Sequence, residues 1–282
     1  MDKSFLPCIL KEKELPMKKR YYLYLAVLVL IAWGFVENTL LGVTSLTVRS
    51  DSLPESARGY RIAQISDLHN TEFGKGSKRL LALLEESQPD LIAITGDLID
   101  SRRTKPEVAV AFAKEAVKIA PCYYVTGNHE SRIPEFPQLE QQLLDAGVTV
   151  LRGQALPLDN GITVAGVDDP AFTGYTVFSE TLSQLAGEDF TVLLSHRPEY
   201  YDLYCRMGFD VVLSGHVHGG QFRIPFLGGL LAPGQGFFPK YDAGLYTNGK
   251  TQLVVSRGLG NSVFPFRLNN PPEVILITLV KP

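Results

Sequence analysis

The order of apolar and polar positions along the chain predicts strands and helices in alternation. Three short apolar runs are typical of buried strands, and each runs into polar residues: 61–66, 91–95 and 123–126. Between these runs, apolar residues recur at helical spacing over 76–86 and over 106–119, where Pro106 stands at the first helical position. Such alternation indicates an α/β fold, in which ligands bind beyond the carboxyl ends of the strands.

The second half of the chain has a less regular pattern. Helices are predicted over 139–144 and 198–207, and further strands over 40–48, 148–151, 162–167, 191–194, 211–213, 253–256 and 274–280. Residues 221–250 are rich in glycine and proline, yet they contain many large apolar side chains. We therefore expect this segment to pack on the domain rather than to form a flexible polar linker.

An uncharged segment near the N-terminus departs from this pattern. Basic residues at 11–20 precede 21–36, which as a helix covers about 24 Å. Because basic flanks stay in the cytoplasm, we predict a cytoplasmic segment over 1–20, an uncleaved membrane anchor over 21–36 and an extracytoplasmic domain over 37–282. No cleavage site for a signal peptide follows the segment. A helix lying in the membrane surface, with the domain inside the cell, is the alternative.

Composition and charge restrict the class of protein. Hydrophobic residues make up 45% of the 282 residues and charged residues 20%, which is typical of a globular core. The net charge of −3 argues against a nucleic-acid partner, which usually requires a basic face. Three scattered cysteines are too few for a disulfide framework; Cys122 and Cys205 are expected to be ordinary buried thiols, with pairing as the alternative in an oxidising compartment.

All five histidines lie at or just after the end of a predicted strand: His69, His129, His196, His216 and His218. The pairs Asp67–His69 and His216–His218 have i, i+2 spacing, which in extended chain points both side chains the same way. Asp97 follows a glycine at another strand end. Imidazole and carboxylate ligands suit manganese, iron or zinc. The candidate ligands are too many for one ion, so two ions that share a carboxylate are predicted.

Five short motifs follow one another along the chain: Asp67-x-His69, Gly96-Asp97-x-x-Asp100, Gly127-Asn128-His129-Glu130, His196 and Gly215-His216-x-His218. As a set they resemble the calcineurin-like metallophosphoesterases, over about residues 37–282. The resemblance implies a four-layer α/β/β/α sandwich, with two mixed sheets flanked by helices. It also implies two divalent metal ions, with manganese expected and iron or zinc as alternatives.

The same resemblance implies a role for each site residue. One metal would be held by Asp67, His69 and His218, and the other by Asn128, His196 and His216. Asp97 would bridge the two metals, and a hydroxide between them would attack phosphorus in line. His129 would face the substrate and help the leaving oxygen, with Asp100 orienting a charged imidazole. From the residues alone, Asp100 is also a candidate cap, and Glu130 is either a cap or a group behind the ligands.

A narrower resemblance concerns the substrate. The apolar anchor, the segment after His218 and Ser256-Arg257-Gly258 look like the membrane-anchored bacterial branch, which is related to enzymes that cleave UDP-2,3-diacylglucosamine. This implies a phosphodiester or pyrophosphate bond, in a lipid-linked substrate. Arg257 is a candidate for binding a phosphate oxygen, and a surface ion pair is the alternative. Two other functions stay open, a protein or small-molecule phosphomonoesterase and a catalytically silent metal-binding module.

Overall fold

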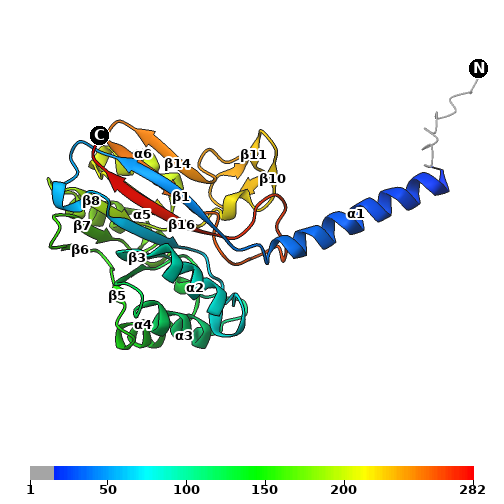
Figure 1. Ribbon diagram of the computed structural model, residues 1–282, viewed down its shortest axis with the longest axis horizontal. Coiled ribbons are helices and arrows are strands. Elements are labelled where there is room, and N and C mark those ends of the chain that lie inside the picture. The colour runs from blue at the N-terminus through cyan, green and yellow to red at the C-terminus, as the bar shows by residue number, and fades with distance from the viewer. Residues whose placement is uncertain (1–15) are drawn as a thin grey trace, which may run out of the picture.

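Two mixed six-stranded sheets lie face to face, with helices over the outer face of each (Figure 1). The structure is a computed structural model that describes residues 16–282. Its first sheet has the order β1-β16-β2-β3-β4-β5, and its second has the order β14-β15-β9-β8-β7-β6. The predicted α/β/β/α sandwich is confirmed, because each sheet buries one face against the other sheet and one face under helices.

The first sheet is parallel except where its last strand enters it. It contains β1 (Gly42–Arg49), β2 (Arg61–Ile65), β3 (Leu91–Thr95), β4 (Cys122–Val125), β5 (Thr149–Val150) and β16 (Glu273–Val280). β16 pairs in parallel with β1 and antiparallel with β2. Three helices cover its outer face: α2 (Lys78–Ser87), α3 (Pro106–Ala116) and α4 (Phe136–Asp145). These helices lie where the apolar periodicity predicts them.

The second sheet is parallel in its centre and antiparallel at both edges. It contains β6 (Gln154–Pro157), β7 (Thr163–Gly166), β8 (Thr191–Leu194), β9 (Val211–Ser214), β14 (Gly244–Asn248) and β15 (Thr251–Val255). Its outer face is covered by α5 (Pro170–Leu185) and α6 (Tyr201–Met207). The sequence pattern does not predict α5, because Gly174 interrupts its apolar stripe. Gly174 takes a φ of 79° and joins two helical pieces.

Side chains alternate between the layers as strand geometry requires. Ile62 of β2 faces the second sheet, whereas its neighbour Ala63 faces the helices. In β8, Val192 faces the first sheet and Leu193 faces α5 and α6. Strands that are buried on both faces read as continuous apolar runs, which is why the sequence identifies them.

The segment after β9 forms a lobe beside the sandwich. It contains two small hairpins, β10 (Arg223–Ile224) with β11 (Gly228–Gly229), and β12 (Leu231–Ala232) with β13 (Gly236–Phe237). The expectation that this apolar segment is structured is confirmed. Many of its large apolar side chains are nevertheless exposed.

Helix α1 (Met17–Glu37) extends away from the domain next to this lobe (Figure 1). It is long and apolar enough to cross a membrane, and it reaches four residues further into the basic stretch than predicted. The rest of the predicted basic segment, residues 1–15, lies outside the described residues. At the domain end of α1, Glu37 is buried, and its carboxylate accepts a hydrogen bond from the Asn270 backbone N–H at 3.0 Å. The helix is therefore fixed to the domain at its end.

Candidate metal centre

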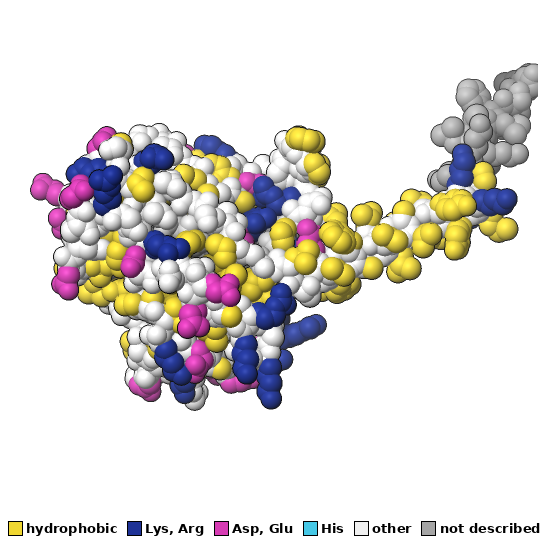
Figure 2. Space-filling view, in the orientation of Figure 1, with side chains coloured by type: hydrophobic (Ala, Val, Ile, Leu, Met, Phe, Trp, Pro, Cys, Tyr) yellow, Lys and Arg dark blue, Asp and Glu magenta, His cyan; other side chains and the backbone are white. Residues whose placement is uncertain are grey.

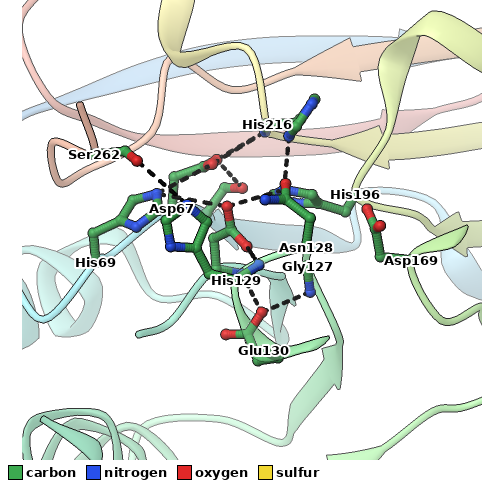
Figure 3. A network of polar contacts seen from close by, with 12 residues as sticks. Asp67, His69, Gly127, Asn128, His129, Glu130, Asp169, His196, His216 and Ser262 are labelled. Atoms are coloured by element: carbon green, nitrogen blue, oxygen red, sulfur yellow. Dashed lines mark hydrogen bonds and ion pairs between the residues drawn. The ribbon is translucent and has the colours of Figure 1, made fainter. Parts of the chain in front are cut away.

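The five predicted motifs meet at one edge of the sandwich, beyond the carboxyl ends of the central strands. Asp67 and His69 follow β2, Asp97 follows β3, and Asn128 and His129 follow β4 of the first sheet. His196 follows β8, and His216 and His218 follow β9 of the second sheet. Figure 3 shows those of them that it labels converging from both sheets on one small volume. Every one of them is buried.

The ligand pairs do not lie in extended chain, and this part of the prediction is wrong. β9 ends at Ser214 and β2 at Ile65, so neither i, i+2 pair belongs to a strand. Positive φ angles occur instead at Asp67 (52°), His69 (45°), His216 (70°) and His218 (48°). Non-glycine residues rarely adopt this conformation, and such strain is typical of functional sites. The turns send His216 and His218 to different clusters, whereas Asp67 and His69 meet in the same one.

One cluster consists of Asp67, His69 and His218. The Nε2 atoms of His69 and His218 lie 3.2 Å apart, and Asp67 Oδ1 lies 3.3 Å from His218 Nε2 and 3.8 Å from His69 Nε2. Burial alone would raise the pKa of the Asp67 carboxyl, but the neighbouring His218 and His69 hold it below its usual range. An ionised carboxylate facing two imidazole nitrogens forms a set of ligands for a divalent cation.

A second cluster consists of Asp97, His196 and His216, with Asn128 beside it. His196 Nε2 lies 3.3 Å from Asp97 Oδ2 and 3.2 Å from His216 Nδ1. The Nδ1–H of His196 donates to the Thr95 carbonyl at 2.7 Å, so Nε2 is left free to bind a cation. Asn128 Oδ1 is buried and finds no donor in the described part of the chain. A cation would satisfy this oxygen, so these residues fit a metal ion as well.

Asp97 lies between the two clusters. Its Oδ2 atom is 3.6 Å from His69 Nε2 of the first cluster and 3.3 Å from His196 Nε2 of the second. Its Oδ1 atom accepts a hydrogen bond from the His129 backbone N–H at 2.8 Å. This is the arrangement predicted for a carboxylate shared by two ions. His216 and His218 belong to different clusters, although only one residue separates them in the sequence.

Glu130 supports the centre from behind. Its carboxylate is fully buried and accepts from the backbone N–H groups of Asp97 (3.1 Å), Leu98 (2.8 Å) and Gly127 (2.8 Å). Burial, with the nearby Asp97 carboxylate, raises the pKa of Glu130 to about 7. The interpretation as a group behind the ligands therefore agrees with the structure. A Cβ at Gly127 would overlap Asp97 Oδ1, which explains the glycine in this motif.

His129 faces the cavity and is held mainly by Ser101. Its Nδ1 atom accepts from the Ser101 backbone N–H at 3.0 Å, whereas Asp100 Oδ1 is 3.6 Å away and caps the Arg102 N–H at 2.9 Å. The proton of the neutral ring is therefore on Nε2, which lies 3.3 Å from Ser262 Oγ. A charged imidazole was expected, but burial lowers the pKa of His129 to about 4. The orienting role of Asp100 stays a prediction.

We expect His129→Ala to lower kcat by about 100-fold or more while both metals stay bound. The ring donates from Nε2 into the cavity, and its removal leaves Asp97, Asn128 and all other ligands in place. Turnover and metal content measured on the same preparation test this expectation. His196→Ala is the contrasting variant, because it should lose metal as well as activity. Loss of metal from His129→Ala would show that His129 is a ligand.

Two arginines occupy places that the sequence did not predict. Arg197, directly after a ligand, is held by the Asp169 carboxylate at 2.5 and 3.0 Å, and its Nη1 atom lies 3.0 Å from His216 Nε2. Arg257, predicted to bind phosphate, contacts Glu273 and Thr44 and does not line the cavity. Its predicted role stays untested, but its guanidinium is engaged in an ion pair. Only the position of Arg197 next to His196 could have indicated it in the sequence.

A cavity of about 610 Å³ opens over the centre. Its floor contains Asp97, Asn128, His129, His216 and His218. The side chains of Arg102, Arg132 and Arg197 line its polar side. The rest of the lining is mostly apolar, and this apolar wall comes from the lobe and from residues 263–264: Phe222, Leu230, Leu231, Pro233, Phe237, Val263 and Phe264. The cavity thus joins a cation-binding floor, three guanidinium groups and an apolar wall.

Comparisons with known proteins agree with this geometry. The sequence profile of the calcineurin-like phosphoesterases matches residues 60–220. The chain is 32% identical over 255 residues to YkuE of Bacillus subtilis, an uncharacterized metallophosphoesterase, covering 87% of each chain. It is 30% identical to the phosphodiesterase YaeI of Escherichia coli, over 80% of this chain and 84% of that protein. The fold resembles TT1561 of Thermus thermophilus, with a TM-score of 0.52, 16% identity and coverage of 71% and 90%.

The family profile covers all the motifs that supply the two clusters, and more than half of the chain. The region that is aligned with each of these two relatives covers most of the relative's length and most of this chain. Both clusters fit divalent cations, and the cavity above them is open to a substrate. The chain therefore belongs to the calcineurin-like phosphoesterases and is a metal-dependent hydrolase of phosphoesters.

Proposed function

We propose that the protein is a membrane-anchored phosphohydrolase that cleaves a phosphodiester or pyrophosphate bond in an amphiphilic, lipid-linked substrate. The observation that carries this proposal is the cavity itself, because the candidate metal ligands and the apolar wall line the same volume of about 610 Å³. A phosphate group suits the floor and the arginines, and a hydrocarbon chain suits the wall. A substrate with both parts uses the whole cavity.

The chain's own residues divide the work of the reaction. Two divalent ions, with manganese as the proposed metal, would lower the pKa of a bound water. They would also place positive charge near phosphorus. Asp97 fixes the distance between the two clusters, because its Oδ2 atom lies 3.6 Å from His69 Nε2 of one and 3.3 Å from His196 Nε2 of the other. Arg197, held by Asp169 and Glu199, lines the cavity, where its guanidinium would attract a phosphate oxygen. The Nε2–H group of His129 donates a hydrogen bond to the leaving oxygen.

The anchor hypothesis rests on how α1 meets the cavity wall. The rings of Phe264 and Phe222, which line the cavity, have centroids 5.4 Å apart. The Phe222 ring packs on Phe266 at 5.4 Å, and Phe266 packs on Phe35 of α1 at 5.8 Å. Continuous aromatic contact thus leads from the cavity to the helix. A substrate that is itself held in the membrane would reach the wall along this side.

The basic residues at the start of α1 set the proposed orientation. Lys18, Lys19 and Arg20 lie in the first turn of the helix, at the end that is far from the domain. Basic residues stay on the cytoplasmic side of a membrane. The catalytic domain, with its lobe and its cavity mouth, is then extracytoplasmic.

The test is a matched series of alkyl p-nitrophenyl phosphate diesters, from methyl to hexyl, assayed with full-length protein in detergent and with manganese. We expect kcat/KM to rise by about tenfold or more across the series, because each methylene that is buried on the wall contributes about 0.8 kcal/mol. Removal of the metals with a chelator should abolish hydrolysis of every member.

Other outcomes identify other functions. Equal rates across the series would exclude the apolar wall as a binding surface. Faster hydrolysis of p-nitrophenyl phosphate than of any diester would indicate a phosphomonoesterase. Binding of metal without hydrolysis of any ester would indicate a silent metal-binding module.

A further inference from the structure

Six apolar side chains form an exposed rim around the mouth of the cavity. Three of them, Phe237, Val263 and Phe264, also line the cavity, while Phe226, Leu227 and Phe238 lie outside it. Phe226 is fully exposed, and the other five have exposed fractions between 42% and 72%. Single exposed apolar residues are ordinary, but six large ones on two segments that contact each other through Phe222 and Phe264 indicate a contact with a partner.

The conformation of the rim makes its exposure more unusual. Phe226 lies between β10 and β11 with a φ of 69°, and Phe238 follows β13 with a φ of 53°. Bulky side chains are disfavoured in this region, and glycine or asparagine would be the ordinary choice in a turn. The positive φ angle and the exposure of the ring to water therefore each cost free energy. Burial of the two rings in an apolar environment would offset both costs.

The rim lies at the end of α1 that is fixed to the domain. Figure 1 shows β10 and β11 beside this end of the helix. Figure 2 shows hydrophobic side chains at the outer tip of the lobe and again where α1 leaves the domain. The Asn38 side chain, one residue beyond α1, donates to the Pro265 carbonyl at 2.7 Å, and Pro265 directly follows Phe264 of the rim. The rim and α1 therefore share one rigid base.

Charge also distinguishes the rim from the rest of the surface. The two segments that build it, 221–240 and 257–272, contain no aspartate or glutamate. Of their four basic residues, Arg223 pairs with Asp242, Arg257 pairs with Glu273 and Arg267 is buried, so Lys240 is the exposed cation. Apolar tips that carry no acidic group suit the headgroup region of a bilayer, and Lys240 would favour anionic lipids there.

We propose that this rim inserts into the surface of the bilayer that holds α1, so that the cavity mouth opens against the lipid headgroups. The proposal rests on the membrane anchoring proposed above for α1. It adds a second contact with the bilayer, made by the catalytic domain itself. The rim would set the distance of the metal centre from the membrane, and a substrate would enter without crossing water.

The experiment places one fluorescent label at a time on the full-length chain in vesicles of phosphatidylcholine and phosphatidylglycerol. The native cysteines are replaced by alanine, and an environment-sensitive dye is attached to Phe226→Cys, to Leu28→Cys in α1 or to Leu144→Cys. Leu144 is an exposed residue of α4, which lies far from α1 (Figure 1). Lipids with a nitroxide on the acyl chain quench any dye that lies in the bilayer. Hydrolysis of a soluble diester confirms that each labelled chain is folded.

We expect the label at Phe226→Cys to lose fluorescence nearly as much as the label in α1, and the label on α4 to lose none. If the α1 label is quenched while the Phe226→Cys label behaves like the α4 label, the rim does not contact the membrane and the anchor alone stands. If the α1 label is not quenched, the anchoring fails and the rim proposal fails with it. Quenching of all three labels would show unspecific adsorption of the domain and would also overturn the proposal.

Discussion

Asp97→Asn is expected to abolish hydrolysis and to lower the content of both metals. Oδ2 of Asp97 lies within 3.6 Å of nitrogen atoms from both ligand clusters, so one substitution weakens two sites. Changes to groups behind a metal ligand already lower affinity by about 10–100-fold, and loss of a shared charged ligand should exceed that. The backbone hydrogen bond that Oδ1 accepts from His129 is within reach of an asparagine side chain, so the fold should survive.

Metal content by mass spectrometry and hydrolysis of bis-p-nitrophenyl phosphate measure the two effects separately. Asp145→Asn is the matched control, because Asp145 is an exposed residue at the end of α4 whose hydrogen bond from Gln141 an amide oxygen can also accept. A variant at Asp97 that keeps two metals and near-normal activity would show that the carboxylate does not join the sites.

Glu130→Ala should destabilise the domain by about 3 kcal/mol or more. The substitution leaves the amides of Asp97, Leu98 and Gly127 buried without acceptors, and each orphaned donor costs about 1 kcal/mol or more. The loop that carries Asp97 should then move, so activity should fall as well. Thermal unfolding in detergent measures the stability, and hydrogen exchange across 96–99 should become faster.

The measurement is made with the metals chelated, which separates loss of the hydrogen bonds from loss of metal binding. Glu86→Ala is the matched control, because Glu86 is an exposed glutamate on α2. If the metal-free Glu130→Ala chain unfolds like the control, the carboxylate does not hold these loops.

The sequence predicts the layers well and indicates which side chains lie together, because buried strands and polar strand ends leave strong patterns. Strands such as β3 and β9 are buried on both faces and read as uninterrupted apolar runs. The five histidines appear at strand ends, and the structure brings them together with Asp67 and Asp97. The strand order explains why: parallel strands end at the same edge of their sheet.

What the sequence misses depends on contacts between distant segments or on backbone conformations that no spacing reveals. The positive φ angles of His216 and His218 are not revealed by their spacing, and Gly215 is required because a Cβ there would overlap the Ser66 hydroxyl and the Asp67 carboxylate of the other sheet's strand end. Ser101 orients His129 through a backbone N–H, which any residue could supply. Arg257 follows the end of β15, but its guanidinium contacts Glu273 of β16 instead of lining the cavity.

The position of β16 between β1 and β2 has a consequence for biosynthesis. α1 and β1 are translated before the other elements of the described chain, whereas β16 is its last strand. Until it is made, β2 keeps an unpaired edge beside β1, and unpaired edges invite aggregation. A nascent chain already carries every metal ligand by residue 218, but its first sheet is still open. The centre therefore matures only after β16 has been made, and a ribosome that stalls before β16 leaves a chain that has every ligand but an incomplete first sheet.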